Sequence, residues 1–158
     1  MKVTTTSVDR QESCRGGLAR LARFALLVHE GGEGGAHGDL LLERAVGTDP
    51  EERALAAFAA PELARALELP AASGAALLLR ELPDHRRHYL FYEGEISGDR
   101  GRVTRLDAGV YLARPAAEDA EEADAGWELT FHGRQLAGRL LLRPAGDAPG
   151  GWRLSRRA

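Results

Sequence analysis

Short apolar runs separated by turn residues dominate the chain from residue 22 onward. The clearest alternation places Trp127, Leu129 and Phe131 on one face of a strand and Glu128, Thr130 and His132 on the other. Turn sequences such as SGDRG, HGR and PAGDAPGG separate the runs. The runs predicted as strands are ARFALLVH, HGDLLLE, ALLLREL, HYLFYEGEI, GRVTRL, GVYLAR, GWELTFH, LAGRLLLR and GWRLSR. Many short strands with turns between them predict a β-barrel or a β-sandwich.

Two parts of the chain depart from this strand pattern. In the segment 48–69, Thr48 or Asp49 can cap a helix and Pro50 suits a first helical position, whereas Pro61 interrupts the pattern. We therefore predict one or two short helices there. The first 21 residues are polar and aperiodic, which predicts a flexible N-terminal arm (1–21) before a folded domain (22–158).

Length and composition limit the class of protein. A chain of 158 residues fits one domain that buries about 70% of the surface of its unfolded form, so it needs no disulfide or structural metal to fold. The single Cys14 cannot form an internal bridge, which favours a reducing, cytoplasmic location. The stretch LARFALLV is interrupted by Arg23 and is too short to cross a bilayer, so no membrane insertion is expected.

Charge is distributed unevenly. The net charge is -3, yet six arginines from Phe131 onward are accompanied by one acid, Asp147. The net charge therefore does not exclude a polyanionic partner. Arginine suits phosphate recognition, although an alanine- and glycine-rich chain can also be rich in arginine through nucleotide composition alone.

The stretch HEGGEGGAHGDLLLE (29–43) contains five glycines and has three interpretations. A phosphate-binding loop is excluded, because His37 occupies the third glycine position of the dinucleotide fingerprint and no lysine is nearby for a P-loop. A slack hairpin loop is one remaining interpretation. A metal site is the other, because His37 and Asp39 share one face of a strand and His29 ends the preceding strand. Two imidazoles and one carboxylate suit Mn, Fe or Zn.

The ordered motifs of the chain resemble those of the 3'-phosphoesterase domain at the N-terminus of bacterial DNA ligase D and its stand-alone relatives. The resemblance covers roughly 23–156. It rests on Arg23, Phe24 and His29; on His37, Asp39, Leu42 and Glu43; on Asp84, His85 and Tyr89; on Tyr92, Glu93, Gly94 and Ile96; on Asp107, Gly109 and Tyr111; and on FHGRQLAG, Trp152 and Leu154.

The resemblance implies a compact single-domain β-barrel that uses a divalent metal, typically manganese, to trim DNA 3' ends. The substrates implied are a 3'-terminal ribonucleoside or a 3'-phosphate, with any ligase or polymerase partner being a separate protein. By position, His29, His37 and Asp39 would bind the metal, whereas His85 and Tyr89 would contact the scissile phosphate. Candidate substrate-binding cations are Arg80, Arg86 and Arg102.

Two other functions remain open at the level of sequence. The resembled family usually has arginine two residues after the metal-binding aspartate, where this chain has Leu41. The interval from His29 to His37 in this chain is also two residues longer than the usual interval in the family. These departures allow a non-catalytic relative that binds nucleic-acid ends or a repair partner. A small-molecule metal enzyme on a cupin-like barrel would keep the ligands, but it leaves the D-H-x-x-x-Y element unexplained.

Overall fold

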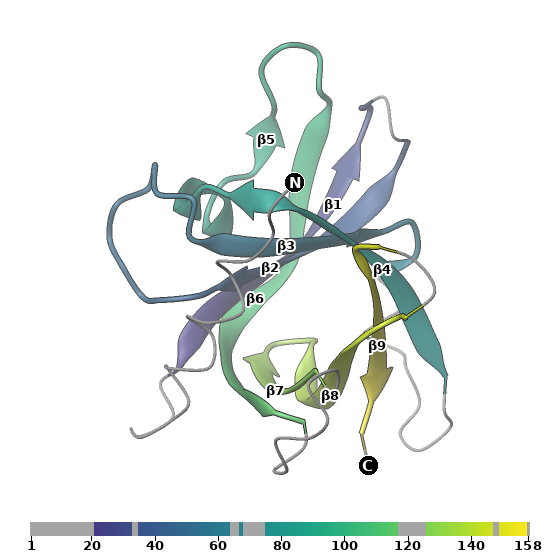
Figure 1. Ribbon diagram of the computed structural model, residues 1–158. Coiled ribbons are helices and arrows are strands. Elements are labelled where there is room, and N and C mark those ends of the chain that lie inside the picture. The colour runs from purple at the N-terminus through teal and green to yellow at the C-terminus, as the bar shows by residue number, and fades with distance from the viewer. Residues whose placement is uncertain are drawn as a thin grey trace.

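A closed antiparallel barrel forms the body of the protein in a computed structural model, which describes residues 21–32, 35–63, 67, 75–116, 126–146 and 149–157 (Figure 1). Eight strands follow the order β1-β2-β3-β4-β9-β8-β7-β6, and pairing of β1 with β6 closes the barrel. The elements are β1 (Ala22–Glu30), β2 (His37–Glu43), β3 (Leu55–Ala60), β4 (Ala76–His85), the 3-10 helix η2 (Arg87–Leu90), β5 (Gly94–Glu95), β6 (Arg102–Pro115), β7 (Trp127–Gly133), β8 (Ala137–Pro144) and β9 (Gly151–Arg156).

The predicted barrel is therefore confirmed. Strand β5 lies outside the closed ring and pairs with the first two residues of β6. Among the described residues, no helix is long and apolar enough to span a bilayer. The predicted arm (1–21) lies outside the described residues except for Leu21, which is exposed.

Three local predictions were wrong. The predicted helix contains β3, whose six residues are all buried between β2 and β4, so burial of an apolar face in the sheet outweighs the helix propensity of alanine. The runs GRVTRL and GVYLAR are one strand, β6, because the intervening Asp107 and Ala108 pair with β1. HYLFYEGEI contains η2 and the short β5 instead of one strand.

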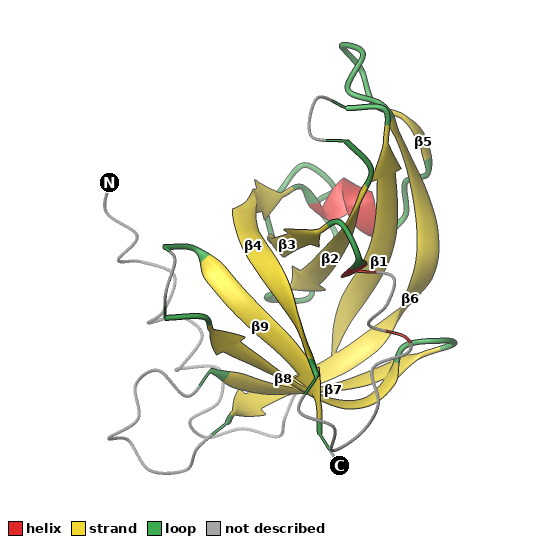
Figure 2. Ribbon diagram, turned by 90° about the vertical axis from the view of Figure 1, so that its right-hand side faces the viewer, coloured by secondary structure: helices red, strands yellow, loops and turns green. Residues whose placement is uncertain are grey.

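Two apolar clusters lie on opposite faces of the same strands. The larger cluster fills the barrel and receives alternate side chains from all eight ring strands, with Phe24, Phe58 and Phe131 almost fully buried. The second cluster lies on the outer face of β1, β2, β3 and β6, where it is covered by residues from η2 and the segment that follows it. Figure 2 shows the helix against this part of the sheet. The second cluster joins η2 to the outer face that carries the candidate site.

Candidate metal centre

His29, His37 and Asp39 converge on the outer face of the β1–β2 hairpin. His29 pairs directly with His37, and Asp39 lies two residues further along β2, so all three side chains project from one face. One ligand atom from each lies within 4.8 Å of the other two. His29 pairs with His37 even though the turn is longer, and Gly31 and Gly35 adopt positive φ angles near the ends of the two strands. This part of the chain could therefore hold a metal ion.

Backbone carbonyls determine which ring nitrogens face this site. His29 Nε2 lies 2.5 Å from the Arg100 carbonyl oxygen, and His37 Nδ1 lies 3.0 Å from that of Gly35. A carbonyl only accepts, so these nitrogens carry the hydrogens, and the lone pairs of the neutral rings are on His29 Nδ1 and His37 Nε2. Metal-binding histidines are commonly oriented by such a second hydrogen bond.

The surroundings of the Asp39 carboxylate also suit a bound cation. Its Oδ1 is buried and has no hydrogen-bond partner among the described residues, and it lies 3.3 Å from His37 Nε2. When the His37 ring is neutral, the lone pairs of His37 Nε2 and Asp39 Oδ1 point at each other and repel. A proton or a metal ion between the two atoms removes this repulsion. When two ligand atoms each lie about 2.1 Å from one ion and the angle between them at the ion is about 90–109°, the two atoms are about 3.0–3.4 Å apart. The observed separation fits a shared ion.

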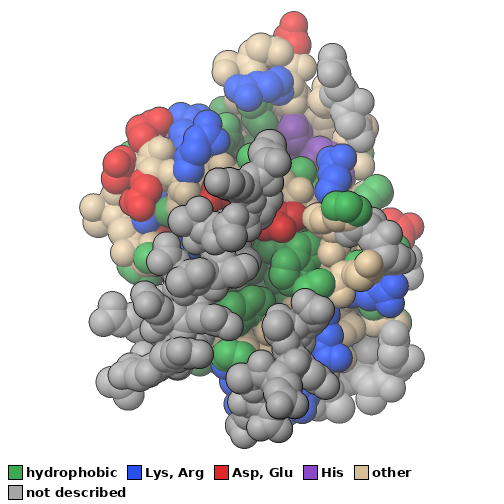
Figure 3. Space-filling view, in the orientation of Figure 1, with side chains coloured by type: hydrophobic (Ala, Val, Ile, Leu, Met, Phe, Trp, Pro, Cys, Tyr) green, Lys and Arg blue, Asp and Glu red, His purple; other side chains and the backbone are tan. Residues whose placement is uncertain are grey.

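Four cationic or titratable side chains act on this carboxylate. Burial raises the pKa of Asp39, and the charges of His37, His85, His29 and Arg80 oppose that rise. Arg80 reaches the site along a row of paired residues, because Asp39 pairs with Ala59 and Ala59 pairs with Arg80. The small Ala59 side chain lies between them in this row. Figure 3 shows histidines gathered at the surface beside a group of Lys or Arg side chains.

His85 and Tyr89 lie together, and His85 is close enough to Asp39 to act on its pKa. His85 ends β4, and its Nδ1 lies 2.8 Å from the Pro83 carbonyl oxygen, which leaves Nε2 as the lone-pair atom of the neutral ring. The Tyr89 ring lies edge-on to His85 at 6.0 Å and packs against the outer apolar cluster. Both residues are half-buried.

The three candidate substrate-binding arginines have different surroundings. Arg80 is exposed and acts on Asp39. Arg86 is bound to Glu51 at 2.8 Å and lies over the Tyr89 ring at 5.6 Å. Arg102 pairs with Glu30, so it projects to the face opposite His29. Of the three, Arg80 is the one that lies in a row with a ligand, on the ligands' face, and acts on the pKa of Asp39.

Leu41 shares the face of Asp39, as predicted, but it is fully buried in the outer apolar cluster. An arginine at this position would have to enter that cluster.

Several residues of the recognised motifs support the site without facing it. Glu43 is completely buried and receives hydrogen bonds from Arg23 and Arg87 at 2.6–2.8 Å. Arg87 also donates to Glu52 and to two carbonyl groups, which fastens η2 to the loop after β2. Asp84 is paired with Arg44, and Asp107 accepts three backbone N–H groups of the β7–β8 turn. These motif residues have structural roles.

Sequence reasoning missed the groups that fix the histidine tautomers. They are backbone carbonyls of Gly35, Pro83 and Arg100, and the last comes from a loop 71 residues after His29. Arg87 was also missed as an anchor of η2. A backbone carbonyl leaves no side-chain pattern in a sequence, so no signal could have identified these acceptors.

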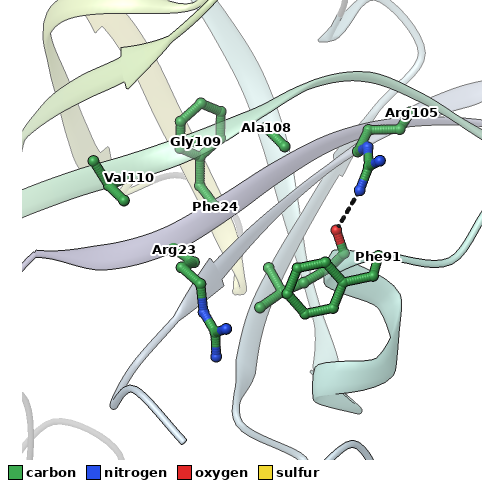
Figure 4. A pocket seen from close by; sticks show the side chains of 8 residues that line it. Arg23, Phe24, Phe91, Arg105, Ala108, Gly109 and Val110 are labelled. Carbon is green, nitrogen blue, oxygen red and sulfur yellow. Dashed lines mark hydrogen bonds between the residues drawn. The ribbon is translucent and has the colours of Figure 1, made fainter. Parts of the chain in front are cut away.

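A hollow of about 330 Å³ lies elsewhere on the outer surface, between β1, β6 and the end of η2 (Figure 4). Arg23, Phe91 and Arg105 line it, and none of the predicted site residues does. The Arg23 guanidinium donates to Glu43 and to the Gly47 carbonyl, and Arg105 donates to the Leu90 carbonyl. Both arginines are therefore held in the lining of the hollow by hydrogen bonds to other parts of the protein.

Comparison with known proteins adds no assignment. No protein-family model matches the chain, and no curated protein matches it.

Proposed function

We propose that the protein is a metal-dependent phosphoesterase that processes DNA 3' ends by removing a 3'-terminal ribonucleoside or a 3'-phosphate. The observation that carries the proposal is the convergence of His29, His37 and Asp39 within 4.8 Å, with the buried Asp39 Oδ1 unpartnered. The order of the motifs resembles that of the DNA ligase D phosphoesterase domain, which supplies the substrate class.

The donor set supports a divalent metal, and we propose manganese. Two imidazoles and a carboxylate suit Mn, Fe and Zn, and the resembled family typically uses manganese. A divalent ion held there would neutralise phosphate charge and supply activated water near neutral pH. The backbone contacts of His29 and His37 hold their unprotonated nitrogens toward it.

The surrounding residues would bind and orient the phosphate. Arg80 is exposed, carries a planar fork of donors, and lies in the row of Asp39, so it would bind phosphate oxygens beside the ligands. His85 Nε2 would accept or donate a proton at a phosphate oxygen, because Nδ1 is held by Pro83. The Tyr89 hydroxyl would orient a phosphate oxygen.

The decisive assay uses a primer-template with one 3'-terminal ribonucleotide or a 3'-phosphate, with manganese, magnesium, zinc or EDTA. Wild type should trim the end with manganese, and His37→Ala should not. Trimming in EDTA, or equal trimming by His37→Ala, would refute the proposal.

A second candidate function is a non-catalytic module that binds nucleic-acid ends or a repair partner. The observation that favours it is Leu41, whose burial excludes the usual arginine from the ligands' face. Binding of a recessed DNA end by the folded protein, without turnover in any metal, would establish this function.

A further inference from the structure

The loop between β5 and β6, residues 96–101, lies against the end of β1 (Figure 1). Glu30 pairs with Arg102, so this β5–β6 loop begins directly beyond the last pair of β1 with β6. The Arg100 carbonyl oxygen of the loop lies 2.5 Å from His29 Nε2. A backbone group of the β5–β6 loop therefore determines which nitrogen of His29 is free to bind a metal.

Glycines allow two stretches of main chain to come into close contact here. A Cβ on Gly101 would overlap the Glu30 carbonyl oxygen and would lie 2.9 Å from the carbonyl carbon of Gly31. A Cβ on Gly31 would lie 3.3 Å from the Gly101 Cα, and one on Gly32 would lie 3.2 Å from the Arg100 carbonyl oxygen. Carbon atoms pack best at about 3.5–4.0 Å. A side chain at Gly101 would therefore push the β5–β6 loop away from β1.

Hydrogen bonds within the β5–β6 loop hold it together. The Ile96 N–H donates to the Gly101 carbonyl at 2.8 Å. The Arg100 guanidinium donates to the Ser97 carbonyl at 2.7 Å and to the Ser97 hydroxyl at 3.2 Å. Because Arg100 is adjacent to Gly101 in this braced loop, a shift at Gly101 would carry the Arg100 carbonyl away from His29.

We infer that Gly101 is a positioning residue of the candidate metal centre. Because it has no side chain, the β5–β6 loop can dock on β1, and the docked loop holds the His29 ring with Nδ1 toward the metal. Gly101 acts through the Arg100 carbonyl and contacts neither metal nor substrate. The inference rests on the proposed function only in taking the site to bind a divalent metal.

Loss of this contact has an expected effect on metal affinity. Without the Arg100 carbonyl, the His29 ring loses the hydrogen bond that selects both its tautomer and its orientation. Such outer partners of metal-binding histidines typically contribute about 10–100-fold in metal affinity. Gly101→Ala should therefore bind manganese about 10–100-fold more weakly than wild type.

The first measurement is manganese binding by isothermal titration calorimetry, with thermal unfolding in EDTA to establish that each variant is folded. The matched control is Gly98→Ala in the same loop. Gly98 also has a positive φ, 76° against 92° for Gly101, but its Cβ would have one described neighbour within 4 Å, Arg100 Nε at 3.9 Å. Alanine therefore strains the backbone at both positions but displaces the loop only at Gly101. Gly98→Ala should bind manganese as wild type does.

The second measurement needs no metal. NMR of ¹⁵N-labelled histidine rings shows whether each neutral ring carries its hydrogen on Nδ1 or on Nε2. His29 should carry it on Nε2 in wild type and should show both tautomers in Gly101→Ala. His37 is the internal control, because the Gly35 carbonyl orients it and its hydrogen should stay on Nδ1 in both proteins.

The inference would be overturned by wild-type manganese affinity in Gly101→Ala, by an equal loss in Gly98→Ala, or by an unchanged His29 tautomer. A tautomer change at His37 equal to that at His29 would also overturn it, because the damage would then be general.

These outcomes are separable from those of the proposed function. If wild type does not trim DNA while Gly101→Ala loses both manganese affinity and the single His29 tautomer, the positioning role is upheld and the phosphoesterase is refuted. Trimming by wild type, with unchanged manganese affinity in Gly101→Ala, would do the reverse.

Discussion

At the scale of single residues, the candidate site depends on how each side chain is held. His29 and His37 are oriented by backbone carbonyls, and the Asp39 carboxylate is buried beside them without a hydrogen-bond donor for Oδ1. Leaving such an atom unpaired costs about 1–3 kcal/mol, more for a charged group. A cation bound to it would recover that loss, which ties metal binding to stability.

The first prediction concerns His37. Manganese at 100 times its dissociation constant should stabilise wild type by about 2.7 kcal/mol, or about 5–10 °C in Tm. His37→Ala should lose this increase, because it removes the Nε2 ligand. Differential scanning fluorimetry with and without manganese makes the measurement. The exposed His132→Ala is the control and should keep the increase; an unchanged increase in His37→Ala would contradict the ligand assignment.

The second prediction concerns Leu41. Leu41→Arg restores the residue usual in the resembled family, but the new charge would enter the outer apolar cluster beneath Tyr89 and Leu90. We expect a loss of about 3 kcal/mol or more in the free energy of unfolding and no gain in 3'-end trimming. Leu41→Met should cost under about 1.5 kcal/mol. A stable Leu41→Arg variant with faster trimming would show that position 41 still accepts a phosphate clamp.

At the scale of elements, strand register and one buried ion network assemble the site. Register places Ala59 between Asp39 and Arg80 and sets His29 against His37. The network of Glu43 with Arg23 and Arg87 joins β1, β2 and η2, and Tyr111 of β6 donates to the Glu43 carbonyl. His85 and Tyr89 flank Arg87 in sequence, so this network holds them close to the sheet.

The third prediction concerns the pH dependence of this network. Burial raises the pKa of Glu43, but hydrogen bonds from Arg23 and Arg87 outweigh it and lower the pKa below 4.5. A lowered folded-state pKa contributes stability above the unfolded value, and this contribution is lost as the pH falls through the folded value. Glu43→Gln should therefore cost about 3 kcal/mol at pH 7.

Urea denaturation at pH 7, 5 and 3.5 measures that cost, and the difference from wild type should shrink below pH 4.5. Glu51→Gln is the control, since Glu51 is an exposed partner of Arg86, and it should change stability by under about 0.5 kcal/mol. If the difference in unfolding free energy between wild type and Glu43→Gln stayed constant from pH 7 to pH 3.5, the charge of Glu43 would not contribute to stability.

The fourth prediction concerns the row from Asp39 to Arg80. Ala59→Leu places a bulky side chain between these residues, so it should reduce trimming about tenfold while leaving the manganese-dependent rise in Tm. Steady-state trimming and thermal unfolding measure the two effects. Ala76→Leu makes the same change at the exposed start of β4 and should leave trimming unchanged. Unaffected trimming by Ala59→Leu would remove Arg80 from the site.

At the scale of the whole molecule, closure of the barrel joins distant parts of the chain. Pairing of β1 with β6 and of β4 with β9 joins strands β1–β4 to strands β6–β9, so neither half has a complete core alone. The Phe58 and Trp152 rings, 5.8 Å apart, are one contact between β3 and β9. The site on the outer face is consequently held by a barrel that forms as a unit.

The fifth prediction is cooperative unfolding. Tryptophan fluorescence reports Trp127 on β7 and Trp152 on β9, whereas circular dichroism reports all the strands. Both should give the same urea midpoint, because loss of any ring strand opens the shared interior. Separate midpoints for the two signals would show that the barrel contains independently unfolding parts.

Strand periodicity alone determined the β-rich fold, most strand positions and the shared face of His37 and Asp39, because a period of two is a local property of the backbone. The ordered motifs predicted that His29, His85 and Tyr89 belong to one site. Local signals failed at Leu55–Ala60, where alanines that favour a helix are buried as a strand between two others.

Only the tertiary structure decided the relations between strands. Whether the strands close into a ring, which residue faces Asp39 across two strands, and which carbonyl holds His29 all depend on pairings between residues far apart in sequence. Motif residues such as Glu43 and Asp107 showed their structural roles only through their partners. The sequence specifies which functional groups are present, but the positions of these groups in space follow from long-range packing and hydrogen bonding.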